Sequence, residues 1–236
     1  VPMKQFLDYL RNKYLEKNFI LLFYILILFL LLTGKVIGQN ISSTTYPLES
    51  STGASLTSFT SLGTLVGSGN DDTNSSLTNI GFDFWFNGVR YTQFGVNSNG
   101  HLKLGSTVTS INYINNLANG TENPKIAPYW DDLTTGSDGY VKYGLVGSAP
   151  NRRLVVEWKT NVYVNNATVS NAAPLLFQAI LSESTGAIQY IYGGTIATST
   201  TGYSIGFSTS STNLVSVASS SNVATYGSDP NTNQTA

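Results

Sequence analysis

The residues of this sequence that could do chemistry are mainly carboxylates, and four of them form two adjacent pairs, Asp71-Asp72 and Asp131-Asp132. Carboxylate oxygens are preferred calcium ligands, and a few of them suffice where calcium is millimolar, as it is around exported proteins. The second pair follows Trp130, which we expect to anchor a strand end in the core and leave both carboxylates at the rim of a sheet. We therefore predict a calcium site at Asp131 and Asp132. The alternative is that these side chains cap turn amides.

The first pair begins a run that partly resembles a calcium-binding loop. Oxygen-bearing side chains follow Asp72 at alternate positions, and a carboxylate stands at the twelfth: Asn74, Ser76 and Asp83. However, Leu77 occupies the position where the EF-hand turn requires Gly. We therefore interpret this run as a solvated turn.

A serine flanked by glycines raises the question of catalysis. Residues 202–206 match the pattern of a nucleophile elbow, but that elbow needs a helix directly after the serine, and here the following residues have strand character. His101 is the only histidine and precedes Ser204, whereas the elbow fold places its histidine last. We interpret Ser204 as a strand residue and His101 as a solvated residue that follows a turn.

Carboxylates could also catalyse glycoside hydrolysis, which needs two of them facing one bond, about 5 to 10 Å apart. Glu157 is alone on its expected strand, with Lys159 beside it on the same face, and an ion pair between the two is the simpler interpretation. Glu183 lies in an expected turn. The sequence therefore predicts that the protein is not an enzyme and requires no cofactor.

Aromatic rings are the remaining side chains that could bind a ligand, because their faces stack on sugars. Trp85 lies opposite the face formed by Phe82 and Phe84, and Tyr129 alternates with Trp130 in the same way. We name Trp85 and Tyr129 as candidate ligand-binding residues. The alternative is that both pack against a second sheet, because the strands of a sandwich are often covered on both faces.

A meander of three strands is expected to position several of these residues. Apolar residues recur at every second position from Ile80 to Phe86, which predicts a half-buried strand. Asn87-Gly88 then predicts a type I′ turn, after which Val89 to Val96 runs back antiparallel. A second turn at Asn97 to Gly100 leads into a short strand, residues 101–104, with one apolar and one solvated face.

Further short strands are expected downstream, and turn signals separate them. They are residues 126–133, 140–146, 152–164, 175–182, 188–192, 203–207 and 214–218. Residues 175–182 are nearly all apolar, which is typical of a central strand covered on both faces. About ten short strands favour an all-β fold of two packed antiparallel sheets, a β-sandwich or jelly roll, over a closed barrel.

Residues 1–38 have the features of a helical secretory signal peptide. A basic leader runs into the uninterrupted apolar segment Phe19 to Leu32, which is shorter than the roughly 18 to 20 residues that span hydrocarbon. Compact residues at 36–38 predict cleavage before Gln39, and the mature domain is expected not to span a membrane. The alternative is a signal anchor that stays in the membrane, because the leader is long.

The composition excludes several classes of function. The chain has no cysteine, which excludes disulfides, thiolate metal sites and a cysteine nucleophile. Its formal net charge is −1, and the part after residue 38 holds more acidic than basic residues. Nucleic acid is therefore not an expected partner, because binding it needs clustered positive charge.

The order of motifs along the chain resembles the nidogen-type extracellular domain. The motifs are a Gly-Phe-x-Phe strand with a Phe-Asn-Gly turn at 81–88, a Tyr-x-x-Phe-x-Val strand with Asn-x-Asn-Gly and Leu-x-Leu-Gly at 91–105, and Ile-Ala-Pro-x-Trp-Asp-Asp-Leu at 126–133. Residues 150–152 and 155–158 fit the next strand, so the resemblance covers most of residues 44–218. The chain is most similar to the versions of this domain at the start of large secreted surface proteins of Bacteroidetes-type bacteria.

The resemblance implies a non-catalytic module of adhesion or matrix proteins, which in that family often precedes fibronectin-type repeats and a C-terminal sorting domain. We therefore predict a secreted or cell-surface module, the N-terminal part of a larger surface protein, that binds an extracellular protein or glycan. The alternative is a carbohydrate-binding module attached to a secreted degradative enzyme. The expected organisation is a signal peptide (1–38), a β-sandwich domain (39–225) and a polar tail or linker (226–236).

Overall fold

The computed structural model divides the chain into two compact units, residues 1–38 and 39–236. The described residues are 3–9, 11–15, 17–18, 46–109, 113–164, 167–168, 174–193, 202–220 and 223–227. Those of the first unit are α-helical, and no helix among the described residues is long and apolar enough to span a bilayer. The apolar segment 19–32 and the predicted cleavage position lie outside the described residues.

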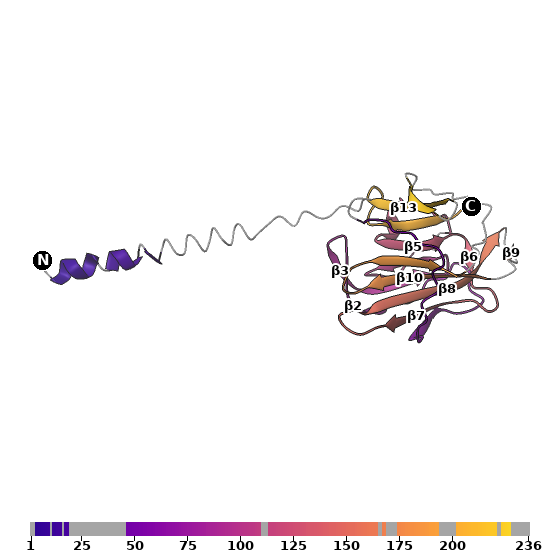
Figure 1. Ribbon diagram of the computed structural model, residues 1–236, viewed down its shortest axis with the longest axis horizontal. Coiled ribbons are helices and arrows are strands. Elements are labelled where there is room, and N and C mark those ends of the chain that lie inside the picture. The colour runs from indigo at the N-terminus through magenta and orange to yellow at the C-terminus, as the bar shows by residue number, and fades with distance from the viewer. Residues whose placement is uncertain are drawn as a thin grey trace. The chain divides into compact units, whose positions relative to one another are not determined.

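The second unit is an antiparallel β-sandwich of two sheets, as the sequence predicts (Figure 1). Sheet 1 has the order β1-β7-β8-β10-β11, and β6 and β9 also pair with β8. Its strands are β1 (Gly63–Val66), β6 (Leu133–Thr134), β7 (Tyr140–Val146), β8 (Arg153–Val164), β9 (Ala167–Thr168), β10 (Leu175–Ser182) and β11 (Ile188–Tyr192). Sheet 2 has the order β14-β13-β12-β5-β4-β3-β2. Its strands are β2 (Thr78–Phe86), β3 (Val89–Asn97), β4 (His101–Leu104), β5 (Lys125–Trp130), β12 (Ser204–Ser208), β13 (Leu214–Ser220) and β14 (Val223–Gly227).

Every predicted strand is present, and the described residues add β1, β6, β9 and β14. β6 and β9 have two residues each, too few to show a period of two. The predicted central strand is also confirmed, because β10 lies between β8 and β11 with buried residues on both faces. Local sequence pattern therefore finds most of the strands but misses β1 and β14, which are edge strands, and the two-residue strands β6 and β9.

The main core lies between the two sheets. The predicted alternation in β2 is confirmed, because Ile80, Phe82, Phe84 and Phe86 are buried in this core. From sheet 1, Trp158 stacks on Phe177 with ring centroids 5.4 Å apart. The indole Nε1 of Trp158 also donates to the carbonyl of Asn97 in sheet 2 at 3.0 Å, which ties the two sheets together at one end.

Both turns of the predicted meander are confirmed. Asn87 and Gly88 have φ angles of 50° and 75°, the left-handed values that a type I′ turn requires, and Phe86 pairs with Val89 across them. The second turn ends at Gly100, where φ is 86° and any Cβ would overlap the carbonyl of Tyr129. Only glycine fits there, so this turn can lie directly against the end of β5.

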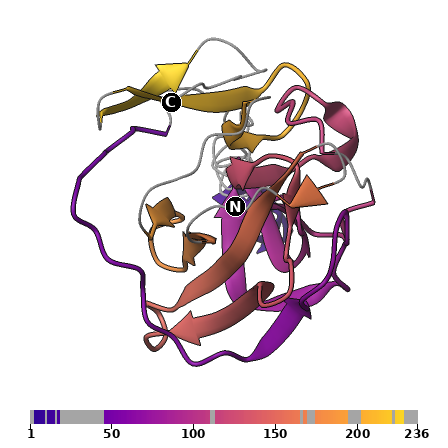
Figure 2. The same ribbon diagram turned by 90° about the vertical axis from the view of Figure 1, so that its right-hand side faces the viewer.

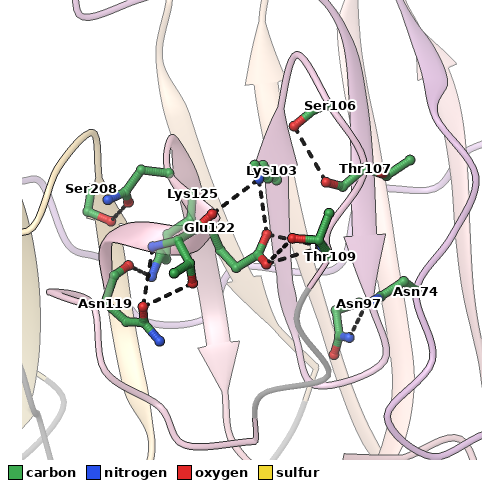
Figure 3. Close-up of polar contacts among 12 residues, drawn as sticks. Asn74, Asn97, Lys103, Ser106, Thr107, Thr109, Asn119, Glu122, Lys125 and Ser208 are labelled. Carbon is green, nitrogen blue, oxygen red and sulfur yellow. Dashed lines mark hydrogen bonds and ion pairs between the residues drawn. The ribbon is translucent and has the colours of Figure 1, made fainter.

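Both faces of β4 are buried, and the prediction of a solvated face on this strand is wrong. Residues 105–109 and 113–124 form a cover loop that includes the 3-10 helix η1 (Gly120–Glu122). Glu122 accepts a hydrogen bond from Lys103 Nζ at 3.2 Å, and Lys125 Nζ donates to the carbonyl of Asn119 at 2.8 Å (Figure 3). His101 and Lys103 are consequently 0% and 9% exposed.

The end of β5 places its two aromatic residues in different environments. Tyr129 lies between the sheets, whereas Trp130 lies on the outer face of sheet 2, packed with Ala127 and with Leu117 of the cover loop. Trp130 is fully buried and anchors the strand end, as expected, but against the cover loop and outside the main core.

Candidate metal-binding site at one end of the sandwich

Three carboxylates come together where β5 ends. One carboxylate oxygen from each of Asp71, Asp72 and Asp132 can be chosen so that all lie within 4.8 Å of one another. Asp131 is not part of this group, because its side chain is fully buried and its Oδ1 accepts a hydrogen bond from the backbone N–H of Asp132 at 2.8 Å. The structure therefore divides the predicted pair and joins Asp132 to residues about 60 positions earlier in the chain. We call Asp71, Asp72 and Asp132 the carboxylate cluster.

The loop before β2 is held against the loop after β5 by backbone contacts. Asp71 forms an isolated β-bridge with Thr134, and the N–H of Thr135 donates to the carbonyl of Asn70 at 2.9 Å. Asp72 has a φ of 46°, a left-handed conformation that Asp tolerates better than most residues. These contacts fix the backbone from which two of the three carboxylates project.

Asn99, from the Asn-x-Asn-Gly turn, connects both loops. Its amide Nδ2 donates to Asp72 Oδ1 at 2.7 Å, and its Oδ1 accepts from the N–H of Leu133 at 2.8 Å. Its backbone carbonyl also accepts from the N–H of Asp131 at 3.2 Å. One asparagine thus sets the separation between Asp72 and the residues around Asp132.

Burial and like charge both disfavour ionisation within the carboxylate cluster. Burial, followed by the charges of Asp71 and Asp72, raises the pKa of Asp132 to about 6. Burial and the charge of Asp72 also raise the pKa of Asp71, although a backbone hydrogen bond opposes this shift. The ion pairs found within the described residues involve no member of the cluster. A bound cation would relieve this repulsion, and three hard oxygen donors suit calcium.

The EF-hand-like run does not form a loop around a metal. Its last carboxylate, Asp83, lies on the outer face of β2 and pairs with Arg90 Nε at 2.7 Å. Residues 78–86 are strand, so Asp83 extends away from Asp72 along the sheet. Asp72 reaches the cluster through tertiary contacts instead.

The two candidate ligand-binding aromatics have opposite exposures. Trp85 is 58% exposed on the outer face of β2, directly opposite Arg90 in the β2–β3 pairing. Tyr129 is 0% exposed, and its ring stacks on Tyr203 with centroids 4.6 Å apart. The fold therefore presents Trp85 to solvent and leaves Tyr129 no open face, and it brings neither of them to the carboxylate cluster in any contact that we observe among the described residues.

The residues weighed for catalysis have structural partners. Ser204 is fully buried, and its hydroxyl donates to the carbonyl of Asn115 at 2.5 Å. His101 is buried against Trp130, so its interpretation as a solvated residue is wrong. Burial, with the nearby charge of Lys125, lowers the pKa of His101 to about 3, which leaves the ring neutral at ordinary pH.

The predicted Glu157–Lys159 ion pair is also wrong. Lys159 pairs with Asp138 at 2.6 Å, whereas Glu157 accepts hydrogen bonds from the Tyr140 hydroxyl at 3.0 Å and from Gln178 Nε2 at 2.7 Å. The partners of Glu157 come from the strands on either side of β8, which a single strand's pattern does not reveal.

A sandwich of two antiparallel sheets with functional loops at one end is the architecture of many extracellular recognition modules. Residues 45–236 match the family model described as NIDO related, so the chain belongs to the NIDO-related family. This family is a non-catalytic, extracellular type of module. No curated protein matches the chain, and neither does any solved structure.

Sequence reasoning missed the participation of Asp71 and Asp72 beside Asp132. The two segments are far apart in sequence, and they meet through an isolated β-bridge and through Asn99. The available signal was the Asn-x-Asn-Gly motif itself, which indicates a turn and supplies two amide side chains that can donate and accept hydrogen bonds.

Proposed function

We propose that this chain is a secreted or cell-surface module for adhesion or matrix interaction, the N-terminal part of a larger surface protein, and that it binds its partner through the loops at the carboxylate cluster. The family supports an extracellular, non-catalytic role. The observation that carries the location is the convergence of Asp71, Asp72 and Asp132 at one end of the sandwich, held there by the family-like motif around Asn99.

The same cluster is the proposed calcium site. Asp71, Asp72 and Asp132 supply the carboxylate oxygens, and Asp131 acts as a positioning residue because it holds the backbone N–H of Asp132. Calcium there would stabilise the ionised form of Asp132, which burial and the charges of Asp71 and Asp72 disfavour, and would order the partner-binding loops. The ion is a structural part of the recognition surface in this proposal and takes part in no reaction.

The test is binding of the purified chain to an array of extracellular matrix proteins and glycans, with calcium and with EDTA. We expect saturable binding that EDTA and Asp132→Asn both abolish. Asp138→Asn is the matched control, because it removes one charge from an exposed ion pair elsewhere and should leave binding unchanged. Binding that is equal with calcium and EDTA, and unaffected by Asp132→Asn, would reject the carboxylate cluster as the binding end.

A second candidate function, glycan binding as a carbohydrate-binding module, is favoured by the exposure of Trp85. The indole lies beside the exposed Asp83–Arg90 pair, so an apolar surface and hydrogen-bonding groups share one face. On the same array, Trp85→Ala should abolish a glycan signal and Trp85→Phe should retain part of it. Val89→Ala is the control, since Val89 is an exposed apolar residue of the same hairpin. A glycan signal that survives Trp85→Ala would exclude this face.

A further inference from the structure

The chain covers two parts of its outer surface with its own residues and leaves a third exposed. Leu56 and Phe59 pack on the outside of sheet 1, within the segment that Figure 2 shows as a purple trace along the domain. The cover loop buries β4 of sheet 2. On the β2–β3 hairpin, by contrast, Asp83, Trp85 and Arg90 point outward and are exposed. We call these three residues the hairpin face.

Trp85 is the exposed tryptophan of this chain. Its exposed fraction is 58%, whereas Trp130 and Trp158, the other two, are fully buried. An indole left in water forgoes the free energy that burial of its apolar area would provide. Tryptophan and arginine are also the side chains that most often carry binding energy at protein interfaces. An exposed tryptophan directly opposite an arginine therefore indicates a contact surface.

Asp83 and Arg90 form an ion pair with two contacts. Arg90 Nε lies 2.7 Å from Asp83 Oδ2, and Arg90 Nη2 donates to Asp83 Oδ1 at 2.8 Å. This geometry fixes the planar guanidinium and carboxylate groups relative to each other. Both side chains are more than half exposed, so the other N–H groups of Arg90 and further lone pairs of the carboxylate remain accessible to a ligand. The pair therefore offers donors and acceptors side by side at fixed positions.

The indole and the ion pair share one face of the hairpin. Trp85 pairs directly with Arg90 across the two strands, and the Cβ atoms of such a pair lie about 4.5 to 5.5 Å apart. Asp83 precedes Trp85 by two residues, which places both side chains on the same face, about 7 Å apart along the strand. The face thus joins a flat apolar surface to a group of hydrogen-bond donors and acceptors.

A second polar pair lies further along the same face. Gln93 Nε2 donates to Asn79 Oδ1 at 3.1 Å, and the two residues are opposite each other in β2 and β3. Asn79 is exposed, like Asp83 and Trp85, in the alternation of β2. A strand extends about 20 Å over the residues from 79 to 85. The hairpin therefore has the length to bind a chain of several units.

The charges around the hairpin face are balanced. Arg90 pairs with Asp83, and Arg152 pairs with Glu183. A hydrogen bond from Arg90 holds the pKa of Asp83 below its usual value, and smaller, opposite effects of Glu183 and Arg152 show that the second pair lies nearby. Because the two pairs cancel, this face has no net charge with which to attract an ionic polymer. An uncharged ligand suits it best.

Carbohydrate is the ligand chemistry that meets these conditions. The C–H groups on one face of a pyranose ring pack on an aromatic ring, whose π face carries negative charge. Neighbouring hydroxyl groups of a sugar each donate and accept hydrogen bonds, so one can donate to Asp83 while the next accepts from Arg90. A linear oligosaccharide repeats this combination of apolar face and hydroxyl groups along its length.

We propose that the hairpin face binds a linear, uncharged oligosaccharide, with one sugar ring on Trp85 and neighbouring hydroxyl groups on the Asp83–Arg90 pair. The proposal rests on the second candidate function, glycan binding at Trp85, and adds the class of ligand and the residues that select it. Asp83 accepts a hydrogen bond from one hydroxyl, and Arg90 donates a hydrogen bond to another. The carboxylate cluster and its metal take no part.

The test uses the full chain and linear oligosaccharides of known composition. The uncharged probes are cellohexaose, maltohexaose, xylohexaose and mannohexaose with their disaccharides, and the anionic probe is oligogalacturonate. Acrylamide quenching of tryptophan fluorescence measures access to Trp85, because Trp130 and Trp158 are buried. We expect at least one uncharged hexasaccharide to protect Trp85 and to bind saturably in calorimetry, and its disaccharide to bind more weakly. No protection by any uncharged probe would overturn the proposal.

Two substitutions test the ion pair. Asp83→Asn removes the carboxylate, and Arg90→Lys keeps the charge but removes the planar fork. Each should weaken binding of the protective hexasaccharide about tenfold, the effect of losing a hydrogen bond to a charged group. Asp138→Asn is the matched control, because it removes a carboxylate from an exposed ion pair elsewhere and should bind as the wild-type chain does. Far-UV circular dichroism checks that all three variants keep the wild-type fold.

The outcomes separate this proposal from glycan binding itself. Binding of an uncharged hexasaccharide that depends on Trp85 but is unchanged by both Asp83→Asn and Arg90→Lys would retain the glycan function and overturn the role of the ion pair. Binding of oligogalacturonate alone through Trp85 would also retain that function, and it would overturn the uncharged ligand class. A matrix protein that protects Trp85 when no oligosaccharide does would reject glycan binding and this proposal together.

Discussion

Two clusters of ionisable side chains in this domain differ in how their charges are balanced. Beneath the cover loop, Lys103 and Lys125 lie with Glu122, and each charged group has partners from the chain itself. At the end of β5, Asp71, Asp72 and Asp132 lie together with the same sign of charge. The charged groups of the first cluster are balanced by the chain itself, whereas we propose that those of the second are balanced by an external cation.

The pKa values of the two clusters express the same difference. Burial opposes ionisation of Glu122, yet hydrogen bonds from Thr109 and Lys103 lower its pKa below the usual value. In the carboxylate cluster, burial and like charge act together and raise the pKa of Asp132. Compensated charge indicates a structural role, and repelling charge held in place by the fold indicates a binding site.

The largest expected effect comes from breaking the compensated cluster. Glu122→Gln should lower the free energy of unfolding by about 3 kcal/mol, because it leaves the mostly buried Lys103 ammonium without its counter-charge. Asp138→Asn breaks the exposed Asp138–Lys159 pair and should cost less than about 1 kcal/mol. Urea denaturation of both variants measures the two losses. Equal losses would mean that the cover loop does not isolate its charges from water.

The next effect isolates His101. Its folded pKa of about 3 lies below the unfolded value of 6.5, so its contribution to stability is complete above pH 6.5 and is lost as pH falls toward 3. Relative to His101→Phe, the wild-type chain should lose about 2 kcal/mol between pH 7 and pH 5. Lys103, Lys125 and Glu122 are common to both chains, so their titrations cancel. Parallel pH profiles of the two chains would contradict the burial of a neutral imidazole.

The smallest effect concerns the carboxylate cluster without metal. The folded pKa of Asp132 is raised, so the group destabilises the fold progressively as pH rises from about 4 to about 6. In EDTA at pH 7, Asp132→Asn should therefore stabilise the domain by about 1 kcal/mol after allowance for solvent screening, and by nothing at pH 4. Thermal unfolding at both pH values checks this. A destabilised variant at pH 7 would show that Asp132 has a structural role that outweighs repulsion.

Local sequence pattern was sufficient for most of the sandwich. The hairpin of β2 and β3 follows from Asn87-Gly88 and from the alternation on either side, because both depend on neighbours in sequence. The same reasoning failed for β4, where His101 and Lys103 read as solvated. The residues that bury these two side chains lie further along the chain. Alternation within one strand does not indicate what packs on either of its faces.

The candidate site was only half predictable for a related reason. Asp132 was recognisable as a carboxylate that follows a buried strand, but adjacent side chains leave the backbone in different directions, and that separates it from Asp131. Its actual neighbours, Asp71 and Asp72, depend on the bridge between Asp71 and Thr134. Such a contact is a property of the topology, which single-sequence patterns do not specify.

The most direct test of the central claim is a calorimetric calcium titration of the metal-free chain at pH 7. Wild-type protein should bind one calcium with a Kd of about 10⁻⁴ to 10⁻³ M, the range of extracellular modules, and Asp138→Asn should bind equally well. Asp132→Asn should weaken binding at least tenfold. Equal binding by wild type and Asp132→Asn, or no binding by wild type at 10 mM calcium (about tenfold above the weaker limit), would contradict the assignment of the carboxylate cluster as a calcium site.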